Sequence, residues 1–139
     1  MTRADTRAVT INAPADHVFD FVADAENLPR WAVGFARSVR RDEGTAGRWI
    51  VATGQGEVPV TLRSDRALGV VDFHLMPAPG VEVVAFSRVV PNGEGAEYVF
   101  TQVQSPGMSD QVFEAQVHAL VEELQVLRAV LHARVACPA

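Results

Sequence analysis

The chain has 139 residues, of which 48% are hydrophobic and 21% charged, and its formal net charge is −5. This length and composition are typical of one globular domain, here 1–139, that buries a core without disulfides or metals. No basic run exceeds Arg40-Arg41, so the sequence offers no nucleic-acid footprint. All twelve cationic residues are arginine, which excludes Schiff-base chemistry and lysine general bases.

No targeting segment is visible in the sequence, so we expect a cytoplasmic protein. The opening MTRADTRAVT lacks the apolar centre of a signal peptide, and no stretch approaches the 18 apolar residues of a membrane span. Cys137 is the single cysteine, so it forms no internal disulfide, and no catalytic motif accompanies it.

The first quarter of the chain predicts a strand, a short helix and a helical turn. Residues 6–13 alternate with Val9 and Ile11 on one face, as a strand does. Pro14 begins a helix over about 14–23, where apolar residues recur at helical spacing. Residues 30–32 predict a second short helical turn. Two short helices between the first two strands suggest a lid or base for a sheet.

The middle of the chain predicts six more strands in a meander. Turn-forming clusters recur at intervals of 11 to 14 residues, at 42–47, 54–57, 65–69, 77–80 and 91–95. Runs rich in Val, Phe, Thr and Trp lie between them. Strands joined by short turns are antiparallel neighbours, so an antiparallel sheet follows.

The 54–57 hairpin predicts a register and an inner face. A turn at Gln55-Gly56 pairs Val51 with Val60 and Trp49 with Leu62. These apolar residues then face inward, whereas Arg48 and Arg63 pair on the outer face.

The inner faces of strands 69–76, 82–90 and 96–104 are harder to assign. An Asn92-Gly93 turn would pair Arg88 with Glu97 outside and leave Tyr98 and Phe100 inside. Bringing Phe73 and Leu75 inside as well requires an irregular loop at 77–81. That arrangement buries the most apolar area, and we favour it.

The end of the chain predicts a long helix over about 109–134. Ser109 is a suitable N-cap, and Asp110 places negative charge in the first turn. An apolar stripe follows at steps of four and three residues: Phe113, Val117, Leu120, Leu124, Leu127 and Leu131. No second helix is comparably long, so this helix should lie across the sheet.

Three stretches together resemble the START/Bet v 1-like (SRPBCC) superfamily, which includes polyketide cyclase/dehydrase-like helix-grip proteins. They are INAPADHVFDFVADAENLPRWA, GVVDFHL with RVVPNGEGAEYVFT, and SPGMSDQVFEAQVHALVEELQVLRAVL. The resemblance implies an α+β helix-grip fold: a seven-stranded curved antiparallel sheet wrapped around the C-terminal helix. Two short helices between strands one and two would close one end, with a cavity between sheet and helix. Functions diverge widely on this fold.

Large inward side chains are the candidate ligand contacts. We expect at least three of the aromatic residues among them to contact a ligand, and the Tyr98 hydroxyl needs a polar partner. The full candidate ligand-binding set is Trp31, Trp49, Val51, Leu62, Phe73, Tyr98, Phe100, Val117, Leu120 and Leu124.

Catalytic and metal signatures are weak. Asp72 and His74 alternate on one strand and form a candidate acid/base pair, but the favoured register turns them outward. His118 and His132 lack the spacing of a helical metal site, so no metal or cofactor is expected. Nucleophile-elbow, phosphate-loop and dinucleotide motifs are absent from the sequence.

Three hypotheses follow. The first is a module that binds a hydrophobic or aromatic small molecule, such as a polyketide-like, lipid or isoprenoid compound, between sheet and helix. The second is a cyclase/aromatase or dehydratase-like enzyme, which needs His74, Asp72, Glu57 or Tyr98 facing inward. The third is a homodimer formed by an outer strand face on which Val84, Phe86 and Val99 are unusually apolar.

Overall fold

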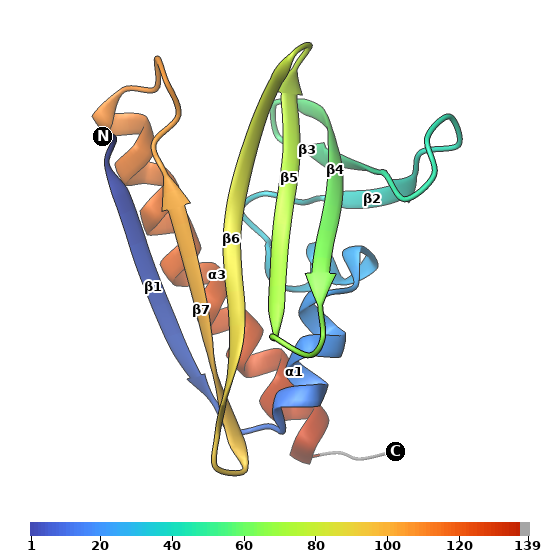
Figure 1. The fold of residues 1–139 in the computed structure, drawn as a ribbon, viewed down its shortest axis with the longest axis vertical. Helices are drawn as coiled ribbons and strands as arrows, with labels where there is room; N and C mark the ends of the chain where they lie inside the picture. The colour runs from blue at the N-terminus through green and yellow to red at the C-terminus, as the bar shows by residue number, and fades with distance from the viewer. Residues whose placement is uncertain (137–139) are drawn as a thin grey trace.

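The structure, a computed structural model, describes residues 1–136, with side chains described through Arg134. A curved antiparallel sheet of seven strands stands against a long C-terminal helix, and shorter helices cover one end (Figure 1). The strands are β1 (Ala4–Ile11), β2 (Ser38–Arg41), β3 (Trp49–Thr53), β4 (Gly56–Asp65), β5 (Val70–Ala78), β6 (Val81–Asn92) and β7 (Gly95–Val103). The helices are α1 (Ala15–Val22), the 3₁₀ turn η1 (Ala25–Asn27), α2 (Leu28–Trp31) and α3 (Asp110–Ala136).

The strand order is β1-β7-β6-β5-β4-β3-β2, and every neighbouring pair is antiparallel. The predicted meander of six strands after the first is therefore confirmed, as is the helix-grip architecture. β1 starts and ends two residues earlier than predicted. β1 forms one edge of the sheet and pairs with β7, so the first and last strands of the chain lie side by side.

The predicted register of the β3–β4 hairpin is wrong by two residues. Val51 pairs with Val58 and Trp49 with Val60, because the turn is Gly54-Gln55 and Gly56 already belongs to β4. A shift of two keeps every side chain on its predicted face. Arg48 precedes β3 and forms an ion pair with Asp42, so the predicted pairing of Arg48 with Arg63 is also wrong.

The β6–β7 hairpin shows the same two-residue shift. Arg88 pairs with Val99 rather than with Glu97, because the turn is Gly93-Glu94. Tyr98 still faces inward and is fully buried, as predicted. The irregular loop at 77–81 is confirmed as a register shift between Leu75 and Ala78, which brings Phe73 to the inner face.

The short helices differ from the sequence prediction mainly in their bounds. α1 lies within the predicted 14–23, with Pro14 as its N-cap residue. The predicted turn at 30–32 is longer and starts earlier, as η1 followed by α2. The start of η1 is capped by the Asp24 side chain, which accepts a hydrogen bond from the Glu26 N–H. The start of α2 is favoured by Pro29 in its first turn.

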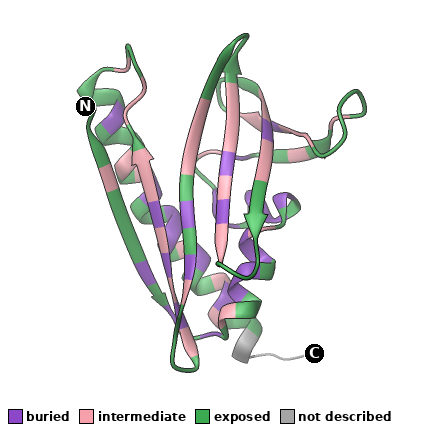
Figure 2. Cartoon of the chain, in the orientation of Figure 1, coloured by how far each residue is buried: buried purple, intermediate pink, exposed green. Residues whose placement is uncertain are grey.

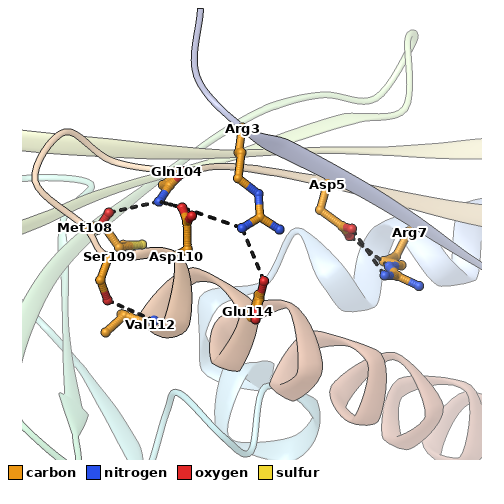
Figure 3. Close-up of polar contacts among 9 residues, drawn as sticks. All are labelled: Arg3, Asp5, Arg7, Gln104, Met108, Ser109, Asp110, Val112 and Glu114. Atoms are coloured by element: carbon orange, nitrogen blue, oxygen red, sulfur yellow. Dashed lines mark hydrogen bonds and ion pairs between the residues drawn. The ribbon is translucent and has the colours of Figure 1, made fainter.

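The start of helix α3 is contacted by Arg3, which precedes β1, and by Gln104, which follows β7 (Figure 3). The Ser109 hydroxyl accepts from the Val112 N–H at 3.2 Å, as predicted for an N-cap. Arg3 of β1's leading segment forms ion pairs with Asp110 at 3.6 Å and Glu114 at 3.4 Å. The guanidinium also lies 5.2 Å from the centre of the Phe113 ring. The N-terminal segment thus fixes the first turn of α3.

The predicted stripe of α3 is its buried face. Phe113, Leu120, Leu124, Leu127 and Leu131 are all buried, and Val117 is half-buried. The helix lies against β1 and α2. Buried residues concentrate where the helices meet the sheet, while the far ends of β5 and β6 are only partly covered (Figure 2).

Candidate functional site

The inner face of the sheet carries an apolar surface that the helices leave partly accessible. Cross-strand pairing aligns Val60, Leu75 and Val83 in one row across β4, β5 and β6. A neighbouring row on the same face of the sheet consists of Leu62, Phe73 and Ala85. Val60 and Phe73 are buried and so mark this face as the inner one. The half-buried residues, which we call the inner apolar patch, are Val58, Leu62, Leu75, Val83 and Ala85.

Four aromatic rings form a cluster beside this patch. Trp31 of α2 meets Phe73 of β5 and Tyr98 of β7 edge to face, with ring centroids 6.5 and 6.0 Å apart. Phe100 lies 5.9 Å from Phe73 and 6.2 Å from Tyr98. The structure therefore brings together four of the five aromatic residues predicted as ligand contacts, from three separate elements.

Polar atoms within this apolar region lack partners. The Trp31 Nε1 and the Gln102 Oε1 are buried and make no hydrogen bond within the described residues. The buried Tyr98 hydroxyl makes none of ordinary geometry either, but the Ser87 side chain lies beside it. Burial raises the pKa of Tyr98, and hydrogen bonding to Ser87 opposes that rise. Ser87 donates its own proton to the Val71 carbonyl at 2.5 Å. A buried donor without an acceptor costs free energy, so such groups are sites where a ligand can supply what the protein does not.

Trp49 lies apart from the other aromatics. Arg41 stacks on its ring at 4.8 Å, and the ring borders two open hollows of about 760 and 410 Å³. Charged groups contribute to both hollows: Asp42 and Glu43 in the larger, Asp20 and Arg66 in the smaller. The larger hollow is bordered by η1 and β2, and the smaller by α1, η1 and the inner-face residue Leu62 of β4. Neither hollow is lined by α3, so neither is the cavity expected between the sheet and that helix.

The other predicted contacts occupy different depths. Val51 is fully buried on the inner face, and Leu62 is half-buried there. Leu120 and Leu124 are buried on α3, and Val117 retains partial exposure near the start of that helix. Val117 and Leu62 are therefore the more accessible members of this group.

The acid/base candidates on the strands face away from the interior. His74 pairs with Val84 across the strands and contacts Glu82 at 2.7 Å on the outer face. Asp72 lies opposite Arg63, and Glu57 forms an ion pair with Arg40. The predicted outward orientation of Asp72 and His74 is confirmed. Of the four candidates, Tyr98 alone faces inward, and its raised pKa keeps the phenol protonated at neutral pH.

Sequence reasoning missed Glu123, the one buried carboxylate among the described residues. It accepts a hydrogen bond from the Gly34 N–H at 3.1 Å, which ties α3 to the connection between α2 and β2. Burial raises the pKa of Glu123 to about 7, against the opposing effect of hydrogen bonds from Gly34 and Phe35. The signal was its spacing: Glu123 follows Leu120 by three residues and precedes Leu127 by four, on the apolar side of the helix.

The outer face of the sheet carries the residues on which the dimer hypothesis depends. Phe86 is exposed on the outer face, beside half-buried Val84 and Val99, as the dimer hypothesis requires. Dimerisation itself stays a prediction.

Residues 1–134 hold no group of three His, Cys, Asp or Glu side chains placed to bind a metal. Cys137 lies outside the described residues.

Solved structures with this fold include two aromatase/cyclase proteins and a START superfamily protein. The Zhui aromatase/cyclase from Streptomyces sp. R1128 is 21% identical, with a TM-score of 0.75 over 97% of this chain and 96% of that one. The di-domain ARO/CYC BexL of the BE-7585A biosynthetic pathway is 20% identical at TM-score 0.77, and the match covers 98% of this chain and 48% of that one. A START superfamily protein from Mycobacterium smegmatis is 15% identical at TM-score 0.72, over 94% and 97% of the two chains. These similarities establish the fold.

A search of curated proteins found no significant match. None of the helices in residues 1–136 combines the length and apolar character that crossing a bilayer requires. The sequence profile of one family, described as "Polyketide cyclase / dehydrase and lipid transport", matches residues 3–132. The match spans nearly the whole chain, which therefore belongs to this polyketide cyclase/dehydrase and lipid transport family.

Proposed function

We propose that this protein binds a hydrophobic or aromatic small molecule on the inner face of the sheet, between the sheet and α3. One observation carries the proposal: the inner apolar patch stays partly accessible directly beside a buried aromatic cluster that contains unpartnered polar atoms. Apolar surface supplies affinity in small-molecule sites, and a few polar groups fix orientation. Membership of a family described by polyketide and lipid chemistry supports the same class of ligand.

The proposal can be tested with native mass spectrometry of the purified protein before and after organic extraction. A co-purifying small molecule that extraction removes would support binding. Nile red, a neutral fluorescent probe, then tests the location. We expect it to bind the extracted protein with enhanced, blue-shifted emission, because the probe leaves water for an apolar surface.

Two adjacent valines provide a matched pair of variants. Val83 belongs to the inner apolar patch, whereas its neighbour Val84 points to the outer face, and both are half-buried. Val83→Asp should weaken Nile red binding roughly tenfold or more, because the carboxylate loses hydration when the probe covers it. Val84→Asp should leave the affinity within about twofold. Equal effects of the two substitutions would contradict the proposed location.

The enzymatic alternative retains one candidate group besides Tyr98. Glu123 is a buried carboxyl group with a pKa of about 7, which suits proton transfer near neutral pH. Glu123 also has a structural role, because it accepts a hydrogen bond from the Gly34 N–H. Conversion of an extracted ligand into a product of different mass would favour a cyclase- or dehydratase-like enzyme over a binding module, provided that Glu123→Gln abolishes the conversion.

A further inference from the structure

We infer that the ligand is an uncharged molecule with a hydrogen-bond acceptor, held by the indole N–H of Trp31 and the hydroxyl of Tyr98. This inference rests on the proposed function and specifies the chemistry of the ligand at the same site. It combines two observations: the polarity of the unpartnered atoms and the absence of buried cations from the described interior.

Two of the three unpartnered atoms belong to the aromatic cluster, and these two define what a ligand bound there must offer. The Trp31 Nε1 can only donate a hydrogen bond, and the side chain is 2% exposed. The neighbouring Tyr98 side chain is 0% exposed, and its protonated hydroxyl can donate a hydrogen bond that the adjacent Ser87 side chain does not accept in ordinary geometry. Two buried donors from rings in edge contact call for an acceptor, such as a ketone, ester or ether oxygen. A purely hydrocarbon ligand would leave both donors unsatisfied at a cost.

The charges exclude an ionised head group in the interior. Of the twelve arginines, eleven are exposed, and the half-buried Arg48 is held by Asp42 at 2.6 Å. The buried polar or charged residues of the described chain are Asn27, Ser87 and Glu123, and none of them is cationic. A carboxylate or phosphate in this region would lose its hydration without gaining an opposite charge. The site therefore favours neutral ligands over fatty acids and phosphates.

Three naphthalenes of similar shape separate these requirements. 2-Ethylnaphthalene has no acceptor, 2-acetylnaphthalene adds a neutral acceptor, and 2-naphthoate adds a charged one. Their dissociation constants can be measured by equilibrium dialysis against the extracted wild-type protein and the variants Trp31→Phe and Tyr98→Phe. Each variant removes one donor while keeping an aromatic ring. Trp49→Phe is the control, because it removes an indole N–H that lies outside the aromatic cluster.

We expect the ketone-to-hydrocarbon affinity ratio to fall about three- to tenfold in Trp31→Phe and in Tyr98→Phe, as loss of one hydrogen bond implies. The ratio should not change in Trp49→Phe, and hydrocarbon affinity should stay within about twofold in all variants. Wild-type protein should bind naphthoate at least about tenfold more weakly than the ketone.

An unchanged ratio in both donor variants would overturn the inference, as would naphthoate binding as tight as that of the ketone. In either case hydrocarbon binding would leave the proposed function standing. Failure of all three probes and of Nile red to bind would overturn the proposed function, and the inference with it. Urea unfolding of each variant confirms that the compared proteins are folded.

Discussion

Trp31 and Tyr98 meet edge to face, with ring centroids 6.0 Å apart and ring planes at 87°, and neither polar atom makes a hydrogen bond of ordinary geometry. One residue ends a short helix and the other lies in the middle of β7. Their contact places two hydrogen-bond donors in the same apolar region. It also means that the unliganded fold carries a cost that a bound acceptor would remove.

The Tyr98 hydroxyl should therefore contribute little to stability in the unliganded protein. We expect Tyr98→Phe to leave the free energy of unfolding unchanged or to raise it by about 1 kcal/mol, because a buried hydroxyl without a partner is destabilising. Urea denaturation of extracted protein measures this. Tyr98→Leu is the comparison: it also loses the edge contacts and should cost about 1–3 kcal/mol. A large loss in Tyr98→Phe would show that the hydroxyl has a partner.

Glu123 should make stability depend on pH. Burial raises its pKa from 4.5 to about 7 in the folded protein. Between these values the folded state binds more protons at Glu123 than the unfolded state, so the contribution of Glu123 to stability is greatest below pH 4.5 and is lost as pH rises through 7. The total loss from this group is about 3 kcal/mol.

Glu123→Gln keeps an acceptor for the Gly34 N–H and cannot ionise. We expect its stability relative to the wild type to rise with pH from about pH 5 to pH 8 by up to about 3 kcal/mol. Urea unfolding at several pH values measures the difference. The neighbour Glu122 is exposed, so Glu122→Gln should not alter the pH dependence in this way. Parallel curves for wild type and Glu123→Gln would contradict the raised pKa.

The buried stripe of α3 should contribute strongly to the core. Leu127 is 0% exposed, and we expect Leu127→Ala to lower the unfolding free energy by about 2–5 kcal/mol through lost burial and a residual cavity. Val121 is exposed on the same helix, and Val121→Ala should change stability by no more than about 0.5 kcal/mol. Thermal or urea unfolding distinguishes the two. Similar costs would mean that α3 does not pack as described.

Two turn glycines with similar backbone angles separate strain from steric clash. Gly69 has φ +71° and Gly80 has φ +74°, but a Cβ on Gly69 would clash with the Val89 carbonyl oxygen, whereas one on Gly80 meets nothing within 4 Å. Gly80→Ala should therefore cost about 1–2 kcal/mol, from the left-handed backbone alone. Gly69→Ala should cost at least about 1 kcal/mol more, because β6 must move. Urea denaturation of both variants tests this, and equal costs would mean that the turn adjusts freely.

The sequence predicted the elements well, because each depends on local patterns. The stripe through Leu120, Leu124 and Leu127 required a helix with one buried side, and Ser109 marked its start. The turn clusters required antiparallel neighbours in a meander. Face assignments also held, because both hairpin registers were wrong by two residues and a two-residue shift preserves the side-chain period.

What the sequence could not determine were the contacts between elements. Nothing local to Trp31 indicates that it meets Tyr98, or that Trp49 lies outside the cluster beside Arg41. Glu123 looks like an ordinary helical glutamate until the connection between α2 and β2 covers it.

Backbone periodicity and turn chemistry act over a few residues, so the sequence by itself determined the elements, their order and the inward faces. The alignment of α2, α3 and β7 depends on packing between segments far apart in the chain. Packing decides which polar atoms lose water, and therefore only the tertiary structure decided where buried donors and a buried carboxylate occur.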